Sequence, residues 1–364
     1  MKLQVTQENL SKALSNVAKI AMTNKNPLPI LNNVLINTID GRLSLSATNL
    51  EIAVTEKVGS KVKDEGSITV PARLMQEYIA SLPSGVLNLE LEDTKLHIST
   101  QQYQSTINGV VADEFPSFPE LTETTQWAIP VRECKKALQQ VVFAASNDES
   151  RPVLTGVFLH TTGGVLFVAA TDSYRLAEKG LMKTSQDISL LVPADAMQEL
   201  LRILPDTVDT VTVIADAQQV LFRAGDIELV TRLIDATYPD YKKLIPNSFS
   251  TSATLPRDEL ISITKVSSLF ARESAGSITL RVDDVDGVVS IDSIASQLGE
   301  NSSKASATIE GSGSVTLNSR YLLDALNAIG SKEVTIAFNG KLEPFVITSQ
   351  EVANQTYLVM PLKS

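Results

Sequence analysis

The sequence is poor in the residues from which disulfide frameworks and most active sites are built. Its 364 residues include one cysteine, two histidines and one tryptophan. A single cysteine excludes an internal disulfide and fits a reducing compartment, so we expect a cytoplasmic protein. No paired-cysteine metal spacing, HExxH or GxSxG motif occurs, and no phosphate-binding pattern follows Gly311-Ser312-Gly313. We therefore expect no catalytic residues, no metal and no cofactor.

Long apolar runs are also absent. The first residues, MKLQVTQENLSKAL, alternate polar and apolar side chains and contain no signal-peptide core. No run approaches the roughly 18–20 apolar residues of a membrane span, so we expect no membrane contact. The net charge of −11 and pI near 4.8 argue against gripping nucleic acid by bulk attraction. A local basic surface stays compatible with that total.

The remaining chemically suggestive residues have simpler interpretations. His97 and His160 stand in strand-like alternation, and we expect neither to be catalytic. Cys134 occupies a position where related segments carry leucine, so it is expected to be a buried small hydrophobe. Three aspartates before Gly287 loosely resemble a calcium loop, but the required downstream carboxylate is missing and the segment reads as a hairpin.

The main feature that is present is a threefold internal repeat. VTQENLSKALSNV from Val5 returns as IPVRECKKALQQV from Ile129 and LPRDELISITKVS from Leu255, at offsets of 124 and 126 residues. A second helical run in each repeat starts at Val70, Val192 and Leu317. Its apolar residues recur at i, i+3, i+4 and i+7, which is typical of one buried helix face.

Strand patterns fill the space between these helices. Alternating segments include 34–38, 43–47, 86–91, 96–100, 211–214, 220–223, 278–282, 288–291 and 334–338. Asp40-Gly41, Gly163-Gly164, Asp286-Gly287 and Asn339-Gly340 are hairpin signals. The chain is thus predicted to be α+β, with two helices packed on antiparallel sheet in each of three repeated domains. We expect these domains to span residues 1–124, 125–249 and 250–364.

Charge is divided unevenly between helices and the rest of the chain. The six expected helical windows, 8–20, 70–83, 131–146, 193–204, 256–272 and 318–330, hold eleven Lys/Arg and eight Asp/Glu, a net of +3. The rest of the chain therefore carries −14. At about 100° per residue, Lys12, Lys19, Arg132 and Lys136 lie opposite the apolar stripes. Arg73 and Arg320 share one repeat position, and Glu77, Glu199 and Asp324 share the next.

Two interpretations fit these helix faces. They are either ordinary solvated surfaces or a weak phosphate-binding surface that carries no sequence code and permits sliding. The carboxylates dilute the basic charge, which favours retention on DNA by topology over retention by affinity.

With the repeats established, the chain resembles the β subunits of bacterial DNA polymerase III, the replicative sliding clamps. The resemblance spans essentially the whole length. It rests on PLPILNNVLI from Pro27, LSLSATNLEIAV from Leu43, SRPVLTGVFL from Ser150, AATDSYRLA from Ala169, DATYPDYKKLIP from Asp235 and the final YLVMPLKS.

The resemblance implies a non-enzymatic processivity factor: a ring-shaped homodimer of six clamp domains that encircles double-stranded DNA without sequence specificity. Its implied partners are the catalytic subunit of DNA polymerase III, the clamp loader, and other DNA polymerases and repair proteins.

The resemblance also implies a pocket between the second and third domains that takes a short extended peptide from these partners. Its expected residues are Leu154, Thr171, Tyr174, Arg175, Leu176, Pro239, Lys243, Leu244, Asn318, Tyr321, Val346, Met360, Pro361 and Leu362. Apolar walls with few polar groups suit anchoring of peptide side chains.

Two further residue sets follow. The expected DNA-facing residues are Lys12, Lys19, Lys25, Arg73, Arg132, Lys136, Arg151 and Arg320. The expected dimer interface places Tyr103 and Ile107 against Leu269 and Phe270.

The sequence departs from the family pattern at several positions. Tyr174 stands where some members have histidine, Pro152-Val153 where some have two tyrosines, and Lys243 where some have arginine. Two other readings compete with the clamp: a repeat-built adaptor without a DNA role, which the acidic charge suits, and a hydrolase, which the shortage of histidine disfavours.

Overall fold

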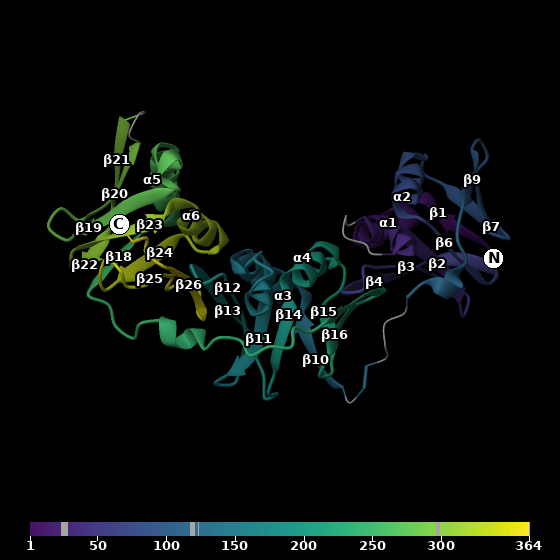
Figure 1. The fold of residues 1–364 in the computed structure, drawn as a ribbon, viewed down its shortest axis with the longest axis horizontal. Coiled ribbons are helices and arrows are strands. Elements are labelled where there is room, and N and C mark those ends of the chain that lie inside the picture. Colours follow the sequence, from purple (N-terminus) through teal and green to yellow (C-terminus); the bar gives the residue numbers. More distant parts are fainter. Residues whose placement is uncertain (23–27, 117–120, 123, 296–298, 364) are drawn as a thin grey trace. The chain divides into compact units, whose positions relative to one another are not determined.

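The chain folds as two compact units in a computed structural model that describes residues 1–22, 28–116, 121–122, 124–295 and 299–363. One unit comprises Met1–Arg132 and Gln198–Leu233, and the other comprises Glu133–Met197 and Ile234–Ser364. Figure 1 shows the course of the chain and the labelled elements. The division falls inside the second sequence repeat, so each unit combines one complete terminal repeat with part of the central one.

Six α-helices lie in the described part of the chain, two in each repeat. They are α1 (Gln7–Ala21), α2 (Ala72–Ser81), α3 (Val131–Val141), α4 (Ala194–Ile203), α5 (Arg257–Phe270) and α6 (Ser319–Ala328). Five of them fall within an expected window and α1 extends beyond its window by one residue at each end, which confirms the helix predictions. Helix α3 stops five residues before its window ends, because residues 142–144 tighten into a 3-10 turn.

The apolar stripes that predicted the helices are the faces that they bury. Leu10, Cys134 and Leu260 are 0%, 4% and 0% exposed, so the repeat-equivalent position is a core position in all three repeats. Burial raises the pKa of the Cys134 thiol to about 12. The prediction that Cys134 is buried is confirmed. Helix α1 packs beside α2, and α5 beside α6 (Figure 1).

The first unit holds two antiparallel sheets. The smaller has the order β5-β1-β7-β8-β9, and the larger has the order β10-β15-β16-β17-β4-β3-β2-β6. In the smaller sheet the strands are β1 (Lys2–Thr6), β5 (Ser60–Asp64), β7 (Val86–Glu92), β8 (Lys95–Ser99) and β9 (Gln104–Asn108). In the larger they are β2 (Asn33–Ile39), β3 (Arg42–Thr48), β4 (Ile52–Val58), β6 (Gly66–Pro71), β10 (Thr125–Pro130), β15 (Thr210–Ala215), β16 (Gln219–Ala224) and β17 (Ile227–Arg232).

The second unit also holds two antiparallel sheets, ordered β14-β11-β12-β13-β26-β25-β24-β18-β22 and β21-β20-β19-β23. The strands of the first are β11 (Gly156–Thr162), β12 (Val165–Thr171), β13 (Arg175–Lys183), β14 (Ser189–Pro193), β18 (Thr251–Pro256), β22 (Thr308–Glu310), β24 (Glu333–Phe338), β25 (Phe345–Thr348) and β26 (Gln355–Val359). Those of the second are β19 (Ser277–Asp283), β20 (Val288–Ala295), β21 (Gly299–Ser306) and β23 (Gly313–Asn318).

Two of the four sheets that the described residues form join neighbouring repeats. Strand β4 of the first repeat pairs with β17 of the second, and β13 of the second pairs with β26 of the third. The sequence predicted antiparallel sheet in each repeat but not this continuity between repeats. An edge strand left unpaired invites association, and the pairing between repeats removes that exposed edge at two junctions.

The sequence also missed a short strand before each helix. β1, β6, β10, β14, β18 and β23 run directly into α1 to α6. The helical periodicity that follows masked them, because each has only five or six residues and ends where the helix begins. Thr6 and Asn318 mark two such transitions: each side chain accepts a backbone N–H from the first turn of its helix.

The hairpin signals are confirmed where two strands follow each other directly. Asp40 and Gly41 have φ values of 52° and 70° between β2 and β3, and Gly163 and Gly164 have 58° and 75° between β11 and β12. Two consecutive positive φ values are the mark of a type I′ turn, which matches the twist of the strands. The Asp286-Gly287 segment likewise links β19 to β20 as a hairpin.

Candidate protein-binding pocket and basic helix faces

The turn between β12 and β13 is held by its own polar side chains. The Asp172 carboxylate accepts the backbone N–H groups of Tyr174 and Arg175, both at 2.9 Å, and the Thr171 hydroxyl donates to the Arg175 carbonyl at 2.6 Å. Ser173 has φ of 80°, so the chain turns sharply there. As a result Tyr174 stands out from the surface, 57% exposed, while Arg175 points inward.

Arg175 links this turn to α6. Its Nε donates to Asp172 at 2.9 Å and its Nη1 to Asp324 at 2.6 Å. The guanidinium also lies over the rings of Phe143 and Tyr321, at 5.3 and 4.8 Å from their centroids. Two carboxylates and two rings therefore fix one side chain that is 15% exposed.

Residues 360–362 near the C-terminus lie against the same turn. The N–H of Met360 donates to the Tyr174 carbonyl at 2.8 Å, and the N–H of Leu362 donates to the Thr316 carbonyl at 2.8 Å. Met360 packs on a buried apolar cluster that includes Leu176, Val346 and Leu358. Residues from β13, β25 and the C-terminal segment thus share one apolar core, with half-buried Met360 at its margin.

The DATYPDYKKLIP segment is anchored to this core by two tyrosines. Tyr238 and Tyr241 are 8% and 2% exposed and belong to the same cluster. Between them, Pro239 and Asp240 stay exposed, and Leu244 is 47% exposed. The segment therefore presents an outer edge of Pro239, Lys243 and Leu244 while its tyrosines fix it from below.

His160 fastens the second tyrosine. Its Nε2 lies 2.6 Å from the Tyr241 hydroxyl and its Nδ1 lies 3.0 Å from the Thr162 hydroxyl. Its ring stacks with Phe158 on the same strand and with Phe167 on the next. Burial and the nearby Lys242 ammonium lower the pKa of His160. Lys242 in turn pairs with the buried Glu178 carboxylate at 2.5 Å.

The structure brings together most of the expected pocket residues. Tyr174 and Met360 are hydrogen-bonded, Arg175 contacts Tyr321, and Leu176 and Val346 share one cluster. Leu154 and Thr171 are buried in the same unit, and Asn318 caps the helix that carries Tyr321. Lys243 does not point to this group: its ammonium pairs with Asp240 at 2.9 Å.

Sequence reasoning missed the residues that support the pocket. These are Phe143, His160, Asp172, Tyr238, Tyr241 and Asp324. The sequence contains one signal for these residues, the repeat position that Glu199 and Asp324 share. The helical periodicity predicts that this acidic position is exposed. That prediction is wrong for Glu199, whose side chain is 14% exposed and pairs with Lys19 at 2.8 Å and Arg202 at 2.7 Å.

The expected DNA-facing residues are exposed where the structure describes them. This holds for Lys12, Lys19, Arg73, Arg132, Lys136, Arg151 and Arg320, whereas Lys25 lies outside the described residues. Two of them are engaged within the chain: Lys19 with Glu199, and Arg151 with Asp148 at 3.5 Å and the Ser173 hydroxyl at 3.1 Å.

The four expected interface residues differ in exposure. Tyr103 and Leu269 are 46% and 51% exposed, and Phe270 is half-buried. Ile107 is 4% exposed, so its side chain packs in the core behind β9. Any contact that Ile107 makes with another chain would pass through the backbone edge of that strand.

Within the described residues, no three His, Cys, Asp or Glu side chains are grouped to hold a metal ion. The helices described there are also too short or too polar to cross a membrane.

The three repeats match three family models. Residues 1–119, 128–240 and 242–363 match the N-terminal, central and C-terminal domains of the DNA polymerase III beta subunit. The fold is therefore that of a three-domain clamp protein, with antiparallel sheets and two helices per domain.

Whole-chain relatives carry the same assignment. The chain is 31% identical to the beta sliding clamp of Synechocystis, covering 100% of this chain and 99% of the relative, and 29% identical to that of Bacillus subtilis, covering both fully. The solved sliding clamp of Bacillus subtilis matches with a TM-score of 0.95 at 27% identity, over 100% of this chain and 99% of that one. The solved beta subunit of Thermotoga maritima matches with 0.92 at 27%, over the same shares. The chain belongs to the DNA polymerase III beta subunit family, the beta sliding clamps.

Proposed function

We propose that this chain is a processivity clamp that encircles duplex DNA as a head-to-tail homodimer and tethers a DNA polymerase to it. The observation that carries the proposal is the similarity of the whole chain, over all three domains, to beta sliding clamps. In this role the protein supplies no catalytic group of its own and works in the cytoplasm, beside the polymerase.

The equivalence of the repeats supports a head-to-tail dimer. The third strand after the first helix of one domain pairs with the last strand of the next: β4 with β17, and β13 with β26. The third equivalent pair is β21 and β9. Each is the terminal strand of its sheet in the described chain. A second copy would complete the pattern by joining β21 of one chain to β9 of the other.

The expected interface residues fit that junction. Tyr103 stands immediately before β9, and Leu269 and Phe270 end the helix α5, which packs on β20 and β21. The exposed apolar surface of Leu269 and Tyr103 would be buried where the two strands meet.

We assign partner binding to the surface around Tyr174, Met360 and Leu244. An apolar floor, an exposed aromatic ring and a few fixed polar groups suit an extended peptide with aliphatic or aromatic anchors. The proposed users are the catalytic subunit of DNA polymerase III, the clamp loader, and other polymerases and repair proteins. We retain 124/125 and 249/250 as the proposed domain boundaries.

The basic helix faces are the proposed DNA surface. Lys12, Lys136 and Arg320 are exposed on α1, α3 and α6 of an otherwise acidic chain. A sparse set of lysines and arginines attracts phosphates without reading bases, so the ring can slide.

The decisive experiment loads the protein onto nicked circular DNA with a clamp loader. We expect a dimer of about twice 39.3 kDa by sedimentation and long retention on the circle. Cutting the circle should release the protein within the dead time of gel filtration, because a ring can slide off the free ends of linear DNA. Equal retention on circular and linear DNA would contradict the clamp and favour an ordinary binding protein, and a stable monomer without DNA retention would favour an adaptor.

A further inference from the structure

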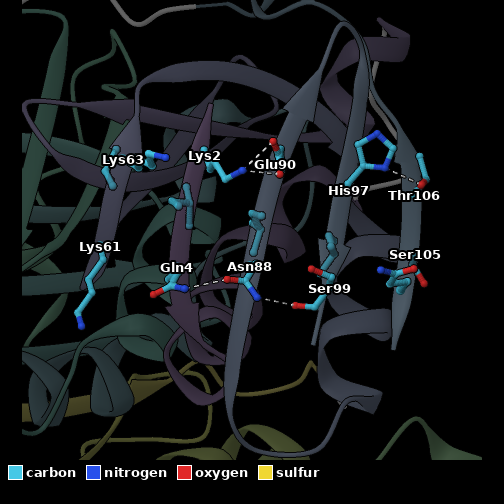
Figure 2. A pocket seen from close by; sticks show the side chains of 15 residues that line it. Lys2, Gln4, Lys61, Lys63, Asn88, Glu90, His97, Ser99, Ser105 and Thr106 are labelled. Atoms are coloured by element: carbon cyan, nitrogen blue, oxygen red, sulfur yellow. Dashed lines mark hydrogen bonds and ion pairs between the residues drawn. The ribbon is translucent and has the colours of Figure 1, made fainter. Parts of the chain in front are cut away.

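The outer face of the small sheet in the first unit is a polar hollow that the clamp function does not use. It has a volume of about 710 Å³ and is lined by β5, β1, β7, β8 and β9 (Figure 2). The inward side chains of these strands, such as Leu3, Leu89 and Ile98, are at most 2% exposed and form the core. The outward ones that line the hollow are polar on every strand, so this part of the face needs no permanent cover.

The strand register arranges these polar side chains in two rows. Lys61, Gln4, Asn88, Ser99 and Gln104 are successive cross-strand partners, and Lys2, Glu90, His97 and Thr106 form the second row. The Gln4 amide donates to Asn88 at 2.9 Å, and the Asn88 amide lies 3.5 Å from the Ser99 carbonyl. The first row thus crosses the sheet as a ladder of amide and hydroxyl groups.

Positive charge is concentrated on one side of the hollow. Lys2, Lys61 and Lys63 oppose a single lining carboxylate, Glu90, which Lys2 already binds at 3.0 Å. Lys61 and Lys63 are exposed on β5 and form no ion pair with any residue that the structure describes. The hydrogen bond from Lys2 lowers the pKa of the Glu90 carboxyl, and Lys63 is close enough to contribute to that shift. Asp64 stands opposite Lys2 across the strands. The lining of the hollow still carries three ammonium groups against one carboxylate, so it forms a local site for negative charge in a chain of net charge −11.

The spacing of the two lysines selects the shape of the ligand. Both line the hollow and stand two residues apart on β5, where an irregularity in the pairing with β1 falls at Lys63. Two residues of extended chain span at most roughly 7 Å, so their Cα atoms lie no farther apart than that. An extended peptide has the same repeat, so acidic residues at alternate positions would meet both ammonium groups. A peptide that runs along β5 in this way would lie beside Gln4 and Asn88 on the neighbouring strands β1 and β7.

The lining also disfavours single-stranded nucleic acid. Among its described side chains there is no Phe, Tyr or Trp ring on which a base could stack. A phosphate chain that crossed the sheet would be repelled by Glu90 in the lining and by Glu92, which lies outside the lining on the same strand. A peptide can carry its acidic residues only where they face Lys61 and Lys63, and uncharged residues where it passes Glu90.

We propose that this face binds an extended, acidic segment of a partner protein, with Asp or Glu at alternate positions opposite Lys61 and Lys63. The site is separate from the proposed polymerase pocket, so either assignment can fail without the other. A simpler role for the two lysines is protection of the terminal strand β5 against pairing with other chains, and the experiment below separates the two.

The test uses the full chain and a fluorescent peptide in which Glu alternates with Thr, measured by anisotropy at low salt. We expect saturable binding that is weakened about tenfold or more, ~1.4 kcal/mol, by Lys61→Glu with Lys63→Glu. The matched control, Lys183→Glu with Lys341→Glu, makes the same charge change at exposed positions elsewhere and should leave binding within about twofold, because distant exposed charges are screened. Amide hydrogen exchange should show protection confined to β5, β1 and β7.

Several outcomes would overturn the proposal. A peptide of the same composition with its Glu residues in one block should bind more weakly; equal binding would mean unselective charge attraction. Tighter binding of a single-stranded oligonucleotide at the same lysines would identify a nucleic-acid site instead. Absence of peptide binding, or binding unchanged in the double variant, would leave the lysines as edge protection. Thermal unfolding of the two double variants checks that both proteins are folded.

Discussion

The Arg175 guanidinium donates to the Asp324 carboxylate at 2.6 Å and thereby ties the start of β13 to helix α6. These residues come from the second and third repeats. The same side chain bonds Asp172 and lies over Phe143 and Tyr321. Arg175 is therefore a largely buried residue that holds the pocket-lining segments in place and contributes little exposed surface to the pocket.

This support predicts a double effect of Arg175→Ala. The substitution leaves Asp172, 13% exposed, without its cation, so we expect loss of stability of about 1–3 kcal/mol as well as weaker partner-peptide binding. Chemical denaturation and peptide titration measure the two separately. Arg175→Lys keeps the charge but not the fork or the stacked plane and should recover only part of either loss. Unchanged stability in Arg175→Ala would contradict the supporting role.

Met360→Ala is the cleaner probe of the proposed pocket. Met360 lies at the margin of the apolar cluster and is half-buried, so its truncation removes contact surface without emptying the core. We expect peptide affinity to fall by about 1–3 kcal/mol, the range of a hot-spot contact, with the dimer intact by sedimentation. Leu342→Ala, an exposed apolar side chain in the same domain, is the control. Equal loss of dimer and peptide binding would mean that the site is misplaced.

His160 predicts a pH dependence of stability. Its folded-state pKa is lowered by burial and by Lys242, so the fold favours the neutral ring. The stability it contributes is fully present above the unfolded pKa of about 6.5 and is lost as the pH falls from there toward the lower folded pKa. We expect the free energy of unfolding to decline more steeply below pH 6.5 in the wild type than in His160→Phe, whose ring fills the same stack but cannot titrate.

Glu56 must be separated from that effect. Burial raises its pKa, so the fold favours the protonated carboxyl, and its contribution is lost as the pH rises through the folded pKa. Its sign is opposite to that of His160. Glu56 contributes equally to the wild-type and His160→Phe curves, so its contribution cancels in their difference. Parallel curves between pH 5 and pH 7 would contradict the assignment of this pH dependence to His160.

The repeat position of Glu77 predicts an ion pair at the dimer junction. It shares a repeat position with Glu199 and Asp324, which both pair with side chains of the preceding domain. Glu77 is exposed, and in a head-to-tail dimer its preceding domain is the C-terminal domain of the other chain. We expect Glu77→Lys to raise the dimer dissociation constant about tenfold, ~1.4 kcal/mol, and Glu343→Lys, also exposed, to leave it unchanged. Equal dimer affinity in both variants by analytical ultracentrifugation would refute the pairing.

The basic helix faces predict a salt-dependent loss of loading onto DNA. Lys12 and Lys136 are repeat-equivalent and exposed. Lys12→Glu with Lys136→Glu should slow loading onto circular DNA, most clearly at low salt, because added ions screen the lost attraction. Lys183→Glu with Lys341→Glu is the charge-matched control. Identical loading rates in both double variants would assign the lysines to an ordinary solvated surface.

The repeats made most of the fold predictable. Helical stripes such as that of Leu10 and Leu260 and turn pairs such as Asp40-Gly41 depend on local periodicity and local backbone conformation, which the sequence displays directly. The pairing of β4 with β17 was not predictable, since any two alternating strands of similar length are compatible with it. Likewise, the buried contact of His160 with Tyr241 joins residues 81 positions apart, which strand alternation around either residue does not reveal.

The sheets that run without a break from one domain into the next have a mechanical consequence. Separating two domains at β4–β17 or β13–β26 would require rupture of a full ladder of backbone hydrogen bonds inside a folded protein. A seam between two separate polypeptides can part and re-form with each copy still folded. A clamp of this construction would therefore be expected to part at its intermolecular seams when it is passed around DNA, and a loader need only pry apart one of them.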